Sequence, residues 1–428
     1  MKENLHLVHR HIFGPKVDFF IASQAKADSF FLHSVFGGFS FFAIMYLLFQ
    51  SIFTWAAPLM DLVETVIATS AGWVLPFIDN SMLYDFVNDA LFGGVGAFLV
   101  FVPQIFILTL VVGILEDSGY LARAAVICHR PLRFFGLTGK SFIPMLSGIA
   151  CAIPGIYAAR TVESPRKRWL TYLAIPLMPC SARLPVYALL IAAFIPASTT
   201  AGGLIGLQGL AMFGIYLFGM LCALLVTAII SRSEKAPEED LPFVLEMPPY
   251  RLPGALPLLR NAWGRAKHFV TKAGPFIFWV SVIVWFLGYF PNNGTNLGNS
   301  WLGQLGQFIE PIFAPLGLDW KYGVAILASF LAREVFVGTL GTLYGIESAD
   351  DDITSLSQRV VDSGLTTASG FALLVFFAIA AMCVSTLAIL RRESGSWRLP
   401  AQMFIGYAIF AYAAAWITYR LILLLTAT

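Results

Sequence analysis

Cysteine, methionine and acidic side chains inside apolar stretches are the residues of this sequence whose types could do chemistry. Cys151 and Cys180 each lie close to proline, and Cys383 follows a methionine. Thiolate and thioether sulfur suit soft metal ions, and carboxylate suits borderline ions such as Fe(II). Proline interrupts a helix, and in a bilayer the freed backbone groups need protein or a water-filled cavity around them. The pattern favours a path for a metal cation. The predicted ligands are Cys151, Cys180, Cys383, Met178, Glu116, Asp117 and Glu334.

These residues also have a purely structural interpretation. A cysteine in an apolar segment is more often a small buried side chain than a ligand, and we interpret Cys128 and Cys222 in this way. For the two proline-flanked cysteines, both interpretations stay open on spacing alone. Burying a charge is costly, so ionisable groups at membrane depth are functional candidates. Glu116 and Asp117, however, fit a helix end at the cytoplasmic interface equally well.

Composition places the chain in a membrane. Of its 428 residues, 58% are hydrophobic and only 12% are charged, whereas a soluble domain carries about 25% charged residues. The mean hydropathy is +0.77. Several apolar stretches reach the roughly 20 residues that a bilayer span needs. The sequence therefore predicts an all-α polytopic membrane protein with about seven to eight spans plus hairpins.

Several other functions are disfavoured. The 5 cysteines are an odd number and lie mostly in or near apolar segments, so they do not fit a disulfide framework. Gly139-Lys140-Ser141 resembles part of a phosphate-binding loop, but that loop needs an earlier glycine where this chain has Phe134. No nucleophile–base pairing or metalloprotease spacing is present. We expect no enzyme, no permanently bound cofactor and no nucleic-acid partner.

Charge predicts the arrangement across the membrane, because Lys and Arg are enriched on the cytoplasmic side. The N-terminus, 116–140, 160–168, 231–268 and 391–399 are expected inside, and 58–96, 196–202, 291–320 and 346–366 outside. Segments 141–159 and 322–345 would then begin and end on one side, so we expect re-entrant hairpins or broken helices there. The expected spans are 36–57, 97–115, 169–195, 203–230, 269–290, 367–390 and 400–425.

A weak internal repeat supports this arrangement. Gly136-Leu137 followed by Lys140 matches Gly317-Leu318 followed by Lys321, and each copy leads into a predicted hairpin. The spans before the two copies run in opposite directions, so the repeats would be inverted, as in many transporters. Coincidence is the alternative. The shared register places Cys151 opposite Ala332, so the two hairpin tips would face one site.

The repeat also divides the chain into parts. We expect a cytoplasmic lead-in at 1–34, a first span with an acidic external segment at 35–96, and a first gate repeat at 97–195. A connecting span and cytoplasmic linker follow at 196–268, then a second gate repeat at 269–390 and a C-terminal span at 391–428.

Motifs spread over most of the chain resemble the ferrous iron transport protein B (FeoB) family. They are Leu115–Arg123, Gly139–Met145, Cys180–Tyr187, Ala332–Val335 and the stretch from Cys383 to Trp397. The resemblance covers about residues 30–420. It implies Fe(II) uptake across the bacterial cytoplasmic (inner) membrane, with path ligands at the positions of Cys151, Cys180 and Cys383.

The sequence departs from the family pattern in three ways. Family members typically begin with a GTPase domain, of which this sequence has no counterpart. A separate GTPase polypeptide, truncation and GTP-independent transport all stay open. The usual Gly-Cys-Asn-x-Pro reads Ala-Cys-Ala-Ile-Pro around Cys151, which removes an amide ligand or hydrogen bond. Ser181 replaces a glycine and Arg333 replaces a lysine.

These departures leave three alternatives to Fe(II) transport. The chain could carry another divalent metal or a small solute, or could be a non-transporting anchor or regulator for a separate GTPase. The expected partners are membrane lipid and a divalent metal ion. A GTPase polypeptide and a second copy of the chain are the protein partners that stay open.

Overall fold

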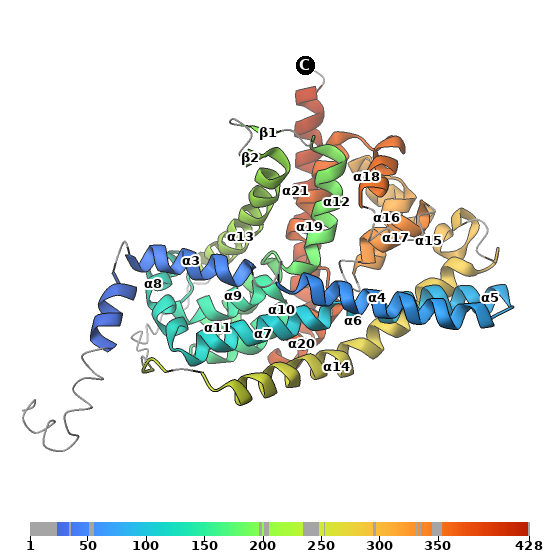
Figure 1. Ribbon diagram of the computed structural model, residues 1–428. Helices are drawn as coiled ribbons and strands as arrows, with labels where there is room; N and C mark the ends of the chain where they lie inside the picture. Colours follow the sequence, from blue (N-terminus) through green and yellow to red (C-terminus); the bar gives the residue numbers. More distant parts are fainter. Residues whose placement is uncertain are drawn as a thin grey trace, which may run out of the picture.

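The computed structural model describes residues 24–33, 36–50, 55–196, 199–200, 205–233, 248–251, 253–293, 297–330, 333, 335–344 and 353–426. These residues are almost entirely helical, which confirms the all-α class (Figure 1). The strands in this part of the chain form one antiparallel hairpin, in which Thr199 of β1 (Thr199–Thr200) pairs with Gly206 of β2 (Ile205–Gly206).

Each predicted repeat is a succession of α-helices and short 3-10 helices. The first repeat comprises α7 (Phe101–Asp117), α8 (Tyr120–Phe134), η4 (Gly139–Ser141), α9 (Phe142–Ala150), α10 (Ala152–Ala158), η5 (Ala159–Thr161), α11 (Pro165–Ala174), η6 (Ile175–Leu177), η7 (Ser181–Arg183) and α12 (Leu184–Phe194). The second comprises α14 (Ala255–Tyr289), η8 (Leu297–Asn299), α15 (Trp301–Phe313), η9 (Ala314–Leu316), α16 (Trp320–Ser329), α17 (Val335–Leu343), α18 (Ile353–Asp362), α19 (Thr367–Ile379) and α20 (Val384–Ser394).

The remaining helices flank and connect the repeats. They are α3 (Phe36–Gln50), α4 (Ala57–Val74), η2 (Leu75–Phe77), α5 (Ser81–Asp85), η3 (Phe86–Gly93), α6 (Gly94–Leu99), α13 (Leu207–Ser233) and α21 (Arg398–Thr426). Figure 1 shows α12, α13, α19 and α21 in one group, and α4, α6, α7 and α14 side by side in another.

The described helices have the lengths and surfaces of a membrane protein. Four stretches are long and apolar enough to span: Pro58–Phe77, Leu207–Ser233, Thr367–Ser394 and Arg398–Leu425. The pair α7 and α8 adds a fifth if it is one span, although it bends by 85°. Large apolar side chains such as Trp73, Ile229 and Leu424 are exposed on these helices. Such surfaces on a soluble protein would be a liability, and here they identify a membrane protein.

The spans differ in several respects from those expected; the span 367–390, for example, is interrupted between α19 and α20. The stretch 58–96 was expected to be an external segment, yet it contains α4, which with η2 is long enough to span the membrane. The sequence did not predict this span because α4 carries two acids, Asp61 and Glu64. The expected span 169–195 is not one continuous helix. It consists of α11, η6, η7 and α12, because prolines at 176, 179 and 185 interrupt it.

The corner of the first repeat explains its sequence signature. Gly136 has a φ of +80°, a conformation that glycine adopts most easily. The N–H of Leu137 then donates to the carbonyl of Leu132 at 3.0 Å, which ends α8 as a Schellman motif. The Thr138 hydroxyl accepts from the N–H of Lys140 at 3.4 Å and begins the next helix.

The second repeat builds the same corner from matching residues. Gly317 has a φ of +69°, and the N–H of Leu318 donates to the carbonyl of Phe313 at 3.4 Å. The Asp319 carboxylate accepts from the N–H of Lys321 at 3.1 Å and caps α16. The weak repeat in the sequence is therefore confirmed as a shared helix end and helix start.

The first predicted hairpin turns back at Cys151. A methyl group added to Gly155 would lie 2.8 Å from the carbonyl oxygen of Pro144 and 3.0 Å from the nitrogen of Gly148, so α9 and α10 pack with almost no space between them. Helices α16 and α17 also pack against each other across their break. Both 141–159 and 322–345 thus contain two helices that pack against each other, as a broken hairpin requires.

The loops that were expected on the cytoplasmic side lie together. Each is tied to another by at least one hydrogen bond or ion pair, so five separate stretches of sequence gather at one end of the molecule. The contacts are Arg123 with Asp28 and Pro248, Lys140 with Glu163, Arg160 with Glu393, and Arg166 with the carbonyl of Ser231.

Both repeats contribute to one main hydrophobic core. Tyr187 and Leu190 of α12 are fully buried there beside Phe336 of α17 and Phe377 of α19. The rings of Phe336 and Phe377 meet edge to face, with centroids 4.7 Å apart. The interface between the repeats is therefore also the centre of the fold, and this interface holds the broken helices.

Candidate functional site

The three predicted path cysteines all occupy breaks between helices. Cys151 is extended (φ −154°, ψ 135°) between α9 and α10. Cys180 lies between η6 and η7, and Cys383 is extended (φ −165°, ψ 104°) between α19 and α20. Breaks of this kind release backbone carbonyl oxygens from helical hydrogen bonds. The three thiols thus lie where helices are interrupted, beside carbonyl oxygens that accept hydrogen bonds from outside a regular helix.

These breaks adjoin one another across the repeat interface. Helix α10, which follows Cys151, packs against both α20 and η6. The N–H of Val384, next to Cys383, donates to the carbonyl of Phe330 at the end of α16, at 3.1 Å. The broken helices of the two repeats therefore meet in the interior of the bundle.

Arg333 bridges these breaks from its position between α16 and α17. Its side chain is almost fully buried (5% exposed). Nη1 donates to the Cys180 sulfur at 3.5 Å, and Nε donates to the Met382 carbonyl at 3.0 Å. Nη2 donates to the carbonyls of Ala380 (3.2 Å) and Pro176 (3.4 Å). One guanidinium thus connects the break at Cys180 in the first repeat with the break at Cys383 in the second repeat.

A second buried guanidinium shares two of these acceptors. Arg183 is fully buried, and its Nη2 donates to the carbonyls of Pro176 at 3.2 Å and Ala380 at 3.3 Å. Its Nη1 donates to the carbonyl of Leu177 at 3.1 Å. Arg183 makes no hydrogen bond to a cysteine sulfur among the described residues. Arg183 therefore fixes backbone carbonyl groups alone, whereas Arg333 also donates to the Cys180 sulfur.

Unsatisfied hydroxyl groups also lie near Cys180. Tyr187 and Tyr216 pack edge to face with ring centroids 6.0 Å apart, and the Cys180 thiol is within electrostatic range of both phenols. Their buried hydroxyls have no hydrogen-bond partner in the described part of the chain. Buried polar groups are normally hydrogen-bonded, often to water. Two buried hydroxyl groups on the α12–α13 side of the core thus remain able to accept or donate a hydrogen bond.

The other predicted sulfur ligands have different environments. Met178 is 2% exposed and belongs to the main hydrophobic core. Met382, which was not among the predicted ligands, accepts a hydrogen bond at its sulfur from the Ser329 hydroxyl at 3.2 Å. Its position beside Cys383 was the signal that could have identified it. Glu334 lies outside the described residues.

The His, Cys, Asp and Glu side chains of the described residues form no preformed metal centre. Among them, no three His, Cys, Asp or Glu side chains lie close enough together to hold one ion. The predicted ligands are therefore distributed over successive breaks rather than gathered in a cage. Conduction requires weak, multiple sites of this kind, because an ion that binds must also leave.

Glu116 and Asp117 lie at a different place, at the end of α7. Glu116 is exposed, and Asp117 pairs with Arg251 at 3.9 Å, with its carbonyl accepting from the Nε of Arg251 at 3.4 Å. No contact among the described residues connects either acid to the cysteine breaks. The helix-end interpretation of these two acids therefore fits their environment.

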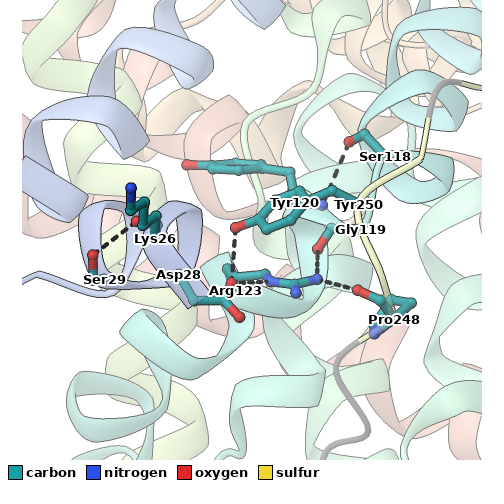
Figure 2. Close-up of polar contacts among 9 residues, drawn as sticks. All are labelled: Lys26, Asp28, Ser29, Ser118, Gly119, Tyr120, Arg123, Pro248 and Tyr250. Atoms are coloured by element: carbon teal, nitrogen blue, oxygen red, sulfur yellow. Dashed lines mark hydrogen bonds and ion pairs between the residues drawn. The ribbon is translucent and has the colours of Figure 1, made fainter. Parts of the chain in front are cut away.

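The sharp bend between α7 and α8, called the elbow below, follows these acids. Arg123 stabilises it, and the sequence analysis did not single this residue out. Arg123 is buried (1% exposed); its Nε donates to Asp28 at 2.9 Å, and its Nη1 donates to the carbonyls of Gly119 (2.9 Å) and Pro248 (Figure 2). Its guanidinium also stacks over the Tyr250 ring, 4.1 Å from the centroid. An arginine inside an otherwise apolar stretch of α8 was the available signal.

The charges at this elbow are mutually stabilised. Burial alone would raise the pKa of Asp28, but hydrogen bonds from Arg123 and Tyr250 hold it below its ordinary value. Burial, together with the hydrogen bond to Asp28, raises the pKa of Tyr250 to about 12. The junction thus ties the helix at 24–31 to α8 and to the described part of the linker, 248–251.

The fold and the site together define a polytopic helical membrane protein built from two gate repeats around broken helices. Comparison with known proteins agrees: a family profile described as "Gate: Nucleoside recognition" matches residues 98–194 and 270–397. A second profile, for the C terminus of ferrous iron transport protein B, matches residues 212–265. The chain belongs to the ferrous iron transport protein B (FeoB) family.

Several curated relatives carry the name Fe(2+) transporter FeoB. The chain is 37% identical to the protein of Leptospira interrogans over 416 residues and 38% identical to that of Leptospira biflexa over 412 residues. It is 36% identical to the Staphylococcus aureus protein over 407 residues. These alignments cover 92–93% of this chain but 59% of each relative. No solved structure matches the chain significantly.

Proposed function

We propose that this chain forms the membrane path of an Fe(II) transporter in the bacterial cytoplasmic membrane, with its N-terminus in the cytoplasm. The observation that carries the proposal is the position of Cys151, Cys180 and Cys383, each at a helix break where the two repeats meet. The name of the relatives, Fe(2+) transporter, supports the choice of ion.

The chemistry of the breaks fits a passing divalent cation. Deprotonated thiols can replace water ligands of Fe(II) one at a time, and the freed carbonyl oxygens can complete the coordination. Because the ligands are distributed over several breaks, no single position holds the ion strongly. The exposed Glu116 and the half-buried Asp117 would attract cations electrostatically at one end of the path.

Flux into sealed liposomes that contain only this chain tests the proposal. Fe(II) is kept reduced under anaerobic conditions, without nucleotide, and uptake is followed with an internal chelating dye. We expect Cys180→Ala and Cys151→Ala each to reduce uptake at least tenfold at equal protein content. Cys128→Ala is the matched control and is expected to keep uptake, because Cys128 lies on the continuous helix α8. Unchanged uptake in both path variants would refute the ligand role.

Two further outcomes distinguish the alternatives. Equal or stronger flux of Mn(II), Zn(II) or a nucleoside in competition with Fe(II) would identify a carrier for another cargo, an option that the description of the gate profile also raises. No flux from well-folded protein, followed by specific binding of a separate GTPase polypeptide, would identify an anchor or regulator.

A further inference from the structure

The acceptors of Arg333 form a set that is unusual for an arginine. Its nitrogens donate to one thiol sulfur and to three backbone carbonyl oxygens, those of Met382, Ala380 and Pro176. No described carboxylate pairs with it. Sulfur and carbonyl oxygen are also the atoms that coordinate a metal cation. The guanidinium is thus a positive charge surrounded by potential metal ligands.

Arg183 shows that this arrangement is specific to Arg333. Both guanidiniums donate to the carbonyls of Pro176 and Ala380, so Arg183 alone already satisfies one lone pair on each oxygen. A carbonyl oxygen has a second lone pair, which is available to another cation. Arg333 occupies these second positions and adds the Cys180 sulfur, which Arg183 does not reach.

We infer that the Arg333 guanidinium is a tethered surrogate cation that occupies a metal position and must leave before an ion binds there. The ligands of this position would be the Cys180 sulfur and the carbonyl oxygens of Ala380, Met382 and Pro176, once they close in around an ion smaller than the guanidinium. The inference rests on the proposed cation path and adds to it a residue that controls occupancy. With Arg333 in place, the position is closed to metal by both volume and charge.

Co(II) binding to the purified full-length chain in detergent tests this inference, because thiolate ligation of Co(II) gives a near-ultraviolet charge-transfer band. Arg333→Met keeps the length of the side chain and removes its charge and donors. We expect Co(II) affinity to increase at least tenfold in this variant, with the increase abolished by adding Cys180→Ala. Arg333→Lys retains the charge and is expected to stay within about threefold of the unsubstituted chain.

Arg183→Met is the matched control. It removes a neighbouring buried guanidinium that shares two acceptors, and it is expected to lower thermal stability without the gain in affinity. Weaker Co(II) binding in Arg333→Met would instead show that Arg333 prepares the thiolate as a ligand. Unchanged affinity with reduced stability would show a purely structural residue. Either result overturns the inference.

A measurement on the unsubstituted chain covers the case in which Arg333→Met does not fold. Phenylglyoxal modifies accessible guanidinium groups, and mass spectrometry quantifies the modification at each arginine. We expect Co(II) to increase modification at Arg333 severalfold and to leave Arg183 unchanged. Equal or lower modification at Arg333 in the presence of Co(II) overturns the inference.

The inference and the proposed function fail in different ways. If Arg333→Met gains Co(II) affinity but liposomes show no flux, the surrogate-cation position stands and transport by this chain alone fails. If Cys180-dependent flux is found but Co(II) affinity does not respond to Arg333, transport stands and the surrogate-cation inference is overturned.

Discussion

Three buried arginines are the residues on which most long-range polar contacts of the interior converge. Arg183 and Arg333 join carbonyls from two broken helices, and Arg123 joins the lead-in, α8 and the linker. A buried charge is tolerated only when it is paired or fully hydrogen-bonded, so each arginine fixes the segments that supply its acceptors. Single substitutions at these positions should therefore act far along the chain.

The Asp28–Arg123 pair predicts a loss of stability in acid. The pKa of Asp28 is lower in the folded protein than its ordinary value of 3.8, so the contribution of the pair is complete above that value. It is lost as the pH falls further, through the folded-state pKa. Hydrogen bonds to charged groups are worth about 1.5–3 kcal/mol. We expect Asp28→Asn to lower the thermal midpoint at pH 7 and to flatten its dependence on pH below about 4.

Thermal unfolding in detergent, followed over a pH series, checks this expectation. Asp61→Asn is the control, because Asp61 is exposed on α4 and makes no ion pair with a described residue. If Asp28→Asn and Asp61→Asn have the same profile, the elbow does not depend on this carboxylate.

At the scale of helices and the corners between them, the structure explains which helix ends and breaks could be predicted from the sequence. Gly136-Leu137 and Gly317-Leu318 are short matches, yet each encodes a complete helix end. Proline likewise located the breaks at Cys151 and Cys180. The break at Cys383 has no adjacent proline, and one continuous span at 367–390 was expected there, so the sequence did not predict this break.

The side chains that meet at the site were harder to predict. Cys180 and Arg333 are separated by 153 residues, and no periodicity connects them. Met178 looked like a ligand because it is two residues from Cys180, but it points into the core. Its counterpart Met382 accepts a hydrogen bond from Ser329. Both methionines belong to the main core, and which of them also meets a polar group depends on tertiary packing, which a single sequence does not display.

A glycine series tests the corners. Alanine at Gly317 would have a strained positive φ of +69°, and its methyl group would lie 2.5 Å from the Ser369 hydroxyl. Alanine at Gly364 would have a similar φ of +84° but no atom within 4 Å. We expect Gly364→Ala to destabilise by about 1–2 kcal/mol from backbone strain alone. We expect Gly317→Ala to destabilise clearly more.

The thermal midpoints of the purified variants give the order. Gly406→Ala serves as the reference, because Gly406 lies within α21, has no positive φ and has no atom within 4 Å of the added methyl group. Equal decreases in the thermal midpoint for Gly317→Ala and Gly364→Ala would show that the corner accommodates the added methyl group without further loss of stability.

At the scale of the whole molecule, the two repeats are joined at one end by a bidentate ion pair. Arg160, after α10, donates from Nε and Nη2 to the two oxygens of Glu393 in α20, at 2.7 and 2.6 Å. The pair is asymmetric, since the arginine side chain is 60% exposed and the glutamate side chain is 5% exposed. The hydrogen bond and charge of Glu393 raise the pKa of Arg160.

This asymmetry predicts unequal effects of the two single substitutions. Arg160→Ala leaves a nearly buried carboxylate without its partner, whereas Glu393→Gln leaves an exposed guanidinium that water can solvate. We therefore expect Arg160→Ala to lower the thermal midpoint more than Glu393→Gln. The exchange Arg160→Glu with Glu393→Arg should recover part of the loss. A larger effect of Glu393→Gln would contradict this account.

The tips of the two hairpins differ in a way that gives the molecule a direction. The corners that precede them are alike, yet the first tip presents the polarisable sulfur of Cys151, and the second presents a permanent positive charge at Arg333. An ion on a route past both tips therefore meets them in a different order in each direction. On the proposed cation path, an ion arriving at the first tip would be offered a ligand, and one arriving at the second would be repelled. We expect such a molecule to act as a rectifier, with influx and efflux rates that differ at equal and opposite gradients.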